Sequence, residues 1–80
     1  MDDKTLLSRI NELADEEHKL FQKEAGGDAS VAERSRLGEL EVTLDQCWDL
    51  LRQRRARRAA GLNPDDAQAR SATVVEKYEN

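Results

Sequence analysis

The chain has 80 residues, so it holds one small domain at most, and its net charge is −4 with 38% charged residues. Its single cysteine, Cys47, excludes an internal disulfide, and no apolar run approaches the ~18 residues of a membrane span. The N-terminal run Met1-Asp2-Asp3-Lys4 lacks the basic start and apolar core of a secretory signal. We therefore expect a cytoplasmic protein without a membrane partner.

The first predicted element is a helix over residues 3–25. Its apolar residues recur in steps of four and three, which is the spacing of one helix face: Leu6, Ile10, Leu13 and Leu20. Asp2 and Asp3 place negative charge at the positive end of this helix. Gly26 is expected to adopt the left-handed conformation that ends a helix.

The second predicted element is a helix over residues 31–60. Ser30 and Glu33 have the spacing of a capping box, and Gly61 supplies the stop. Its apolar residues repeat the steps of the first helix in the opposite order: Leu37, Leu40, Leu44, Cys47 and Leu51.

The two apolar seams match in one antiparallel register. It pairs Leu6 with Leu51, Ile10 with Cys47, Leu13 with Leu44 and Leu20 with Leu37, and it places Arg54 opposite Asp3. The predicted fold class is all-α: residues 1–61 form a long, coiled-coil-like antiparallel helical hairpin. In residues 62–80, Asn63 and Pro64 begin a short helix that ends near Arg70, followed by a tail.

Apolar side chains flank the seam on both helices and widen the apolar face: Leu7, Phe21, Trp48 and Leu50. An exposed column of this kind is typical of a partner surface, and a second copy would complete a four-helix bundle. We therefore predict a homodimer that associates through these residues. The alternative is that the tail folds back and covers the flank with Val74, Val75 and Tyr78.

Five arginines lie within seven residues near the end of the second helix: Arg52, Arg54, Arg55, Arg57 and Arg58. Such a cluster can bind an acidic protein or the phosphates of a nucleic acid. The acidic net charge and the lack of interleaved aromatic residues argue against nucleic acid. The structural interpretation is that the arginines complement the helix dipole and pair with nearby aspartates, namely Asp2, Asp3, Asp49, Asp65 and Asp66.

The run Asp15-Glu16-Glu17-His18 contains metal-ligand residue types, and Glu41 lies on the facing helix. A metal-binding dimer would use Glu17, His18 and Glu41, as in carboxylate-bridged bundles. However, His18 falls on the outer face, so we interpret the run as a solvated acidic face, with Glu17 turned outward or paired with Arg36. No cofactor is expected.

No phosphate loop, nucleophile–base pair or zinc-ligand spacing occurs, and a thin hairpin lacks an enzyme-sized pocket. Cys47 lies on the seam, where a core role is expected. We therefore predict a protein that is not an enzyme.

Residues 39–56, with their core Leu44-Asp45-Gln46-Cys47-Trp48-Asp49-Leu50-Leu51, resemble the signature of a family of short uncharacterised actinobacterial proteins, a domain of unknown function. Residues 15–18 and 63–65 resemble other parts of that pattern. The resemblance implies a lineage and a cytoplasmic location, but neither an activity nor site residues.

Taken together, these patterns predict a small interaction or regulatory protein that self-associates through its apolar helical face. A nucleic-acid accessory factor that uses the arginine cluster and the metal-binding dimer are the alternatives.

Overall fold

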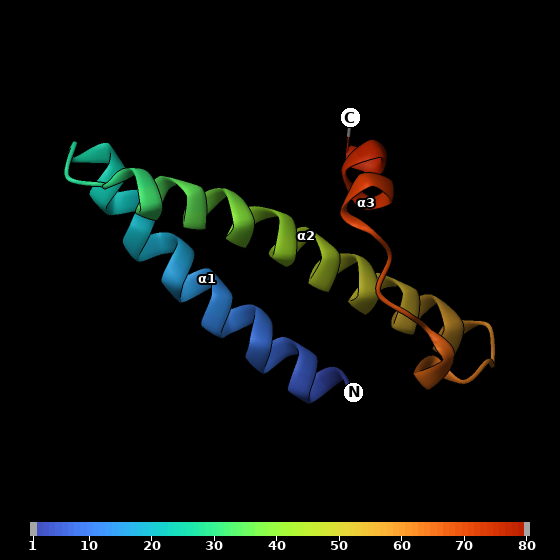
Figure 1. The fold of residues 1–80 in the computed structure, drawn as a ribbon. Coiled ribbons are helices and arrows are strands. Elements are labelled where there is room, and N and C mark those ends of the chain that lie inside the picture. The colour runs from blue at the N-terminus through green and yellow to red at the C-terminus, as the bar shows by residue number, and fades with distance from the viewer. Residues whose placement is uncertain (1, 80) are drawn as a thin grey trace.

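The fold is all-helical and is built around two long helices, as the sequence predicts. The computed structural model describes residues 2–79, and the side chains of residues 2–76. Helix α1 spans Asp3–Ala25 and helix α2 spans Val31–Ala59, followed by the 3-10 turn η1 at Pro64–Asp66 and helix α3 at Ala72–Glu79. Figure 1 shows α1 and α2 as an antiparallel hairpin, with α3 on the side of α2 away from α1.

An apolar core between α1 and α2 holds the hairpin together. This core consists of buried residues from both seams: Leu6, Ile10, Leu13, Leu40, Leu44 and Leu51. Leu20 and Cys47 pack against it while only partly buried. At the open end of the hairpin, Arg54 Nε donates to Asp3 Oδ1 at 2.6 Å. These are the two residues that the predicted register places opposite each other.

Both long helices end in the same type of turn. The N–H of Gly27 donates to the carbonyl of Glu24, and the N–H of Asp28 donates to that of Lys23, which is a Schellman motif. Gly61 and Leu62 repeat the pattern after α2. The prediction that Gly26 takes the left-handed conformation is wrong, because Gly26 is the cap residue with a φ of −82° and Gly27 has the positive φ of 78°.

The segment after α2 turns back along α2 rather than extending into solvent. Gln53 Nε2 donates to the carbonyl of Gln68 at 2.9 Å, and Gln46 Nε2 donates to that of Arg70 at 3.3 Å. Val75 of α3 is buried, whereas Val74 is 39% exposed. The side chain of Tyr78 lies outside the described residues. The fold-back alternative is therefore observed for Val75, although Trp48 stays 42% exposed.

The short helix predicted to run to Arg70 is wrong, because only Pro64–Asp66 form a 3-10 turn. Ala67 already has an extended backbone with a ψ of 139°. The carbonyls of Gln68 and Arg70 accept hydrogen bonds from side chains of α2, so a tertiary contact replaces the local helix. Helix α3 then begins at Ala72, and the side chain of the preceding Ser71 accepts from the N–H of Val74.

Candidate interaction surface

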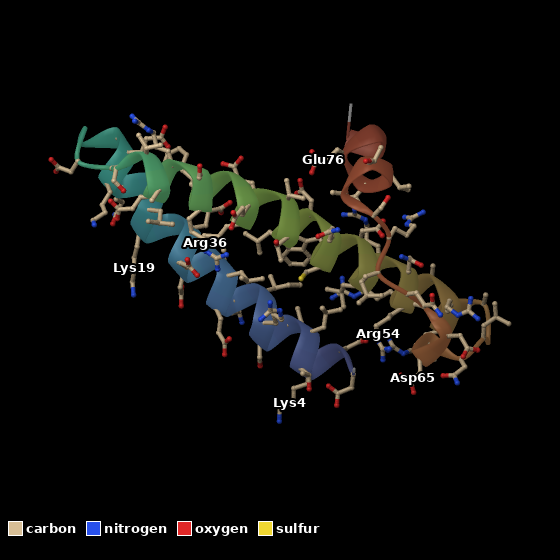
Figure 2. All side chains as sticks on the ribbon, viewed as in Figure 1. Lys4, Lys19, Arg36, Arg54, Asp65 and Glu76 are labelled. Atoms are coloured by element: carbon tan, nitrogen blue, oxygen red, sulfur yellow. The ribbon has the colours of Figure 1, made fainter. Side chains whose placement is uncertain are left out.

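Arg54 joins three segments at the open end of the hairpin. Its guanidinium donates to the carboxylate of Asp3, to the carbonyl of Pro64 at 3.2 Å and to Asp65 Oδ1 at 3.0 Å. Figure 2 shows Arg54 and Asp65 facing each other between the end of α2 and η1. Only 5% of Arg54 is exposed, so this member of the arginine cluster is inside the fold.

Two further arginines of the cluster are also engaged within the chain. Arg57 Nε donates to the carbonyl of Asn63 at 2.8 Å and forms an ion pair with Asp66 at 3.6 Å. Arg58 donates to Asp3 Oδ2 at 2.9 Å. The predicted structural role thus applies to Arg54, Arg57 and Arg58, which fasten the start of α1 and the η1 turn to the end of α2.

Arg52 and Arg55 differ from the other three arginines. Both are exposed, and neither forms an ion pair with any side chain that the structure describes. Arg58 is exposed as well but is paired with Asp3, so Arg52 and Arg55 are the exposed members of the predicted partner-binding set that form no ion pair with a described side chain.

Asp49 is a buried carboxylate that the sequence predicts to pair with the arginine cluster. Its partner is instead Arg70, which donates from both Nε and Nη2, and Gln53 Nε2 also donates to it at 3.0 Å. The guanidinium of Arg70 lowers the pKa of Asp49 despite its burial. Asp49 therefore fastens the tail to α2. In the sequence, the one signal for this contact with the tail is that Asp49 shares the face of α2 opposite the seam with Gln46 and Gln53.

The apolar flank residues fall on different sides of the hairpin. Leu7 packs partly buried against the core, and Phe21 is 59% exposed. Leu50 also packs against the core, but it lines a cavity on the side where the tail crosses α2. That cavity has a volume of about 220 Å³, below the ~300–1,000 Å³ typical of ligand sites. Its lining comprises Leu6, Arg9, Thr43, Gln46, Cys47, Leu50 and Ala69.

The metal candidates are not gathered into one site. Among the described residues, no group of three or more His, Cys, Asp or Glu side chains is placed to hold a metal ion. His18 and Glu41 are exposed, and Glu17 is half-buried. The pairing of Arg36 with Glu17 is wrong: Arg36 donates to both carboxylate oxygens of the neighbouring Glu16, at 2.7 and 3.1 Å. This ion pair lowers the pKa of Glu16.

Cys47 has the environment of a core residue. It is half-buried against the apolar core, and burial raises the pKa of its thiol. A thiol of this kind is mostly protonated at neutral pH, which agrees with the core role expected for it.

Along one face of α2, charged and aromatic residues lie side by side, and none of the charged ones forms an ion pair with a described side chain. They recur in steps of four and three, and we call them the Trp48 face: Glu41, Asp45, Trp48, Arg52 and Arg55. Asp45 is half-buried and the other four are exposed. Since the tail binds Gln46, Asp49 and Gln53, the Trp48 face lies between the side of α2 that packs on α1 and the side that packs on the tail.

Comparison with known proteins places the chain in a family. A family model described as "Protein of unknown function (DUF2630)" matches residues 2–80. The chain belongs to the DUF2630 family. Relatives of this DUF2630 chain include uncharacterised proteins of Mycobacterium bovis and of two strains of Mycobacterium tuberculosis. Each is 46% identical over 77 residues, which cover 95% of this chain and 88% of the relative.

The match confirms the resemblance to a family of short uncharacterised actinobacterial proteins, and it assigns no activity to the DUF2630 hairpin. No solved structure matches the chain. Within the described residues, none of the helices combines the length and the apolar character needed to cross a membrane.

Proposed function

We propose that this protein is a small, non-enzymatic interaction module that self-associates through the apolar side of its hairpin. The observation that carries this proposal is the exposure of Trp48 and Phe21, at 42% and 59%, although the tail has already folded back onto α2. Large aromatic side chains are enriched in the buried centres of interfaces, where they contribute much of the binding energy.

The position of the tail supports a partner from outside the chain. The tail packs on the face of α2 that carries Asp49 and Gln53, so the alternative in which it shields Trp48 is not the arrangement observed. A second copy brings its own exposed Trp48, and a two-fold contact buries both tryptophans at once.

The arginine cluster supports a protein partner better than a nucleic acid. Arg54, Arg57 and Arg58 are paired with carboxylates of the same chain, whereas Arg52 and Arg55 are exposed and form no ion pair with a described side chain. Two arginines on a chain of net charge −4 offer few contacts to a phosphate backbone. Acidic side chains, including those of a second copy, suit them better.

Size-exclusion chromatography with light scattering tests the proposal. The expected result is a mass of twice the 9.1 kDa chain for the native protein, and a shift toward 9.1 kDa for Trp48→Ser. Val31→Ser is the matched control, since Val31 is 72% exposed but lies at the start of α2, away from Trp48. A native protein that elutes at 9.1 kDa at every loading concentration would contradict the proposal.

A further inference from the structure

The Trp48 face carries its charges in a definite order. Two acids, Glu41 and Asp45, come first; Trp48 follows; and two arginines, Arg52 and Arg55, come last. None of the four charged residues forms an ion pair with a described side chain, although most carboxylates and arginines nearby on α2 do. The face therefore presents an acidic half and a basic half; Arg52 also acts on the buried Asp49, whose pKa it helps to lower.

This order is complementary to itself in only one orientation. When two copies of α2 lie antiparallel across a two-fold axis, the acidic half of each meets the basic half of the other. A parallel arrangement would bring acid against acid and arginine against arginine, which costs free energy. A two-fold contact also uses the same surface on both copies, so the acidic half and the basic half of one Trp48 face are both matched by the other copy.

We propose that two copies of this chain associate through the Trp48 face in an antiparallel α2–α2 contact, with Glu41 of each copy against Arg52 of the other. The proposal rests on the self-association proposed above and specifies its geometry. In this register Asp45 lies opposite Trp48 of the second copy, and Arg55 reaches the same acidic half as Arg52.

The apolar flank of α1 fits the same axis. Because Glu41 of each copy faces Arg52 of the other, the two-fold axis passes α2 at the midpoint of these two residues, between Gln46 and Cys47. In the hairpin register Ile10 is opposite Cys47, so the axis passes α1 between Ile10 and Asn11. That point is also the midpoint between Leu7 and Ala14.

The axis therefore places Leu7 of each copy opposite Ala14 of the other, which gives two symmetry-related contacts. A large residue against a small one is the arrangement by which facing helices interdigitate. Leu7 and Ala14 are both only partly buried where they pack against the core of their own hairpin, so each has surface left to cover. The charge pattern on α2 and the size pattern on α1 are independent features of the sequence, and they agree on one axis.

The two kinds of contact have different roles. Exposed ion pairs contribute little individually, so burial of Trp48 and Leu7 supplies the affinity. The charged pairs set the orientation, because reversing one of them creates two symmetry-related repulsions in the same dimer.

Charge reversal tests the register by sedimentation velocity over a concentration series at low salt. Glu41→Arg and Arg52→Glu are each expected to weaken the dimer by about tenfold or more, since each places like charges together at both contacts. The double variant Glu41→Arg/Arg52→Glu restores opposite charges and is expected to return to within about threefold of the native Kd. Lys19→Glu is the matched control, because Lys19 points away from α2 (Figure 2).

An equimolar mixture of the two single variants provides a second measurement. In the mixed dimer the two introduced side chains, an arginine and a glutamate, meet at one contact, and the native Glu41 and Arg52 meet at the other. Association is therefore expected to return although each variant alone is weakened. Far-ultraviolet circular dichroism confirms that every variant keeps its helices. The mixture contains only the two single variants, so its recovery does not require the double variant to fold.

The outcomes separate the two proposals. If the native protein is a dimer but neither the double variant nor the mixture recovers, the antiparallel register is wrong and self-association stands. Single variants that dimerise as tightly as the native protein also overturn the register. A native protein that is monomeric throughout overturns both proposals.

Discussion

At the scale of single residues, long-range ion pairs decide what the arginine cluster does. Arg54 was expected opposite Asp3 because the seam register places it there, and the structure confirms the contact at 2.6 Å. Its second partner, Asp65, comes from the turn after α2, and no periodic pattern relates that turn to the helix. The sequence could therefore predict a cluster of arginines, but not which of them are consumed inside the fold.

Arg54→Ala is expected to lower the thermal midpoint by roughly 10 °C, because it leaves Asp3 with fewer partners and releases the η1 turn. Thermal unfolding followed by circular dichroism measures this change. Lys19→Ala is the control, an exposed basic residue that points away from α2 (Figure 2), and it is expected to leave the midpoint within about 2 °C. Equal midpoints for the two variants would mean that Arg54 does not join the three segments.

At the scale of elements, the hairpin was predictable and the tail was not. Helix α1 was predicted at residues 3–25 and is observed at Asp3–Ala25, because its seam and its caps are local signals. The capping box of Ser30 and Glu33 is likewise present at the start of α2. The tail departs from its local signals, since Asn63 and Pro64 start only one 3-10 turn before side chains of α2 bind the backbone that follows.

The contact between the tail and α2 is expected to depend on pH through Asp49. Its pKa is lowered below the usual 3.8 by Arg70, so the ionised form stabilises the folded state. This contribution is fully present above about pH 5 and is lost as the pH falls through the lowered pKa. Asp49→Asn is expected to cost about 1–2 kcal/mol at pH 7 and less at pH 3.

Urea unfolding at pH 7 and pH 3 measures this difference. The pKa values of Asp3 and Glu16 are also lowered, by Arg54 and Arg36, so the native protein loses stability in acid for more than one reason. The contribution of Asp49 is therefore the difference in the free energy of unfolding between the native protein and the variant at each pH. Asp15→Asn, an exposed site on α1, is the control. A cost for Asp49→Asn that is equal at both pH values would contradict the role of the ion pair.

At the scale of the whole molecule, the fold has one long hairpin with a covered side and an uncovered side. The tail occupies the side of α2 that carries Asp49, and the Trp48 face remains accessible. The sequence indicated that the apolar face was wider than one hairpin can bury. It could not show which flank the tail would take, because that choice depends on hydrogen bonds between segments that are 15 to 24 residues apart.

Trp48 is the only tryptophan of the chain, so its fluorescence reports directly on whether the Trp48 face is covered. The most direct test of self-association is therefore the emission spectrum of the native protein over a dilution series from high micromolar to nanomolar concentration. Self-association through this face is expected to give blue-shifted emission when the protein is concentrated and a cooperative red shift on dilution, with no change in helical content. A red-shifted emission maximum that stays the same at every concentration would contradict it.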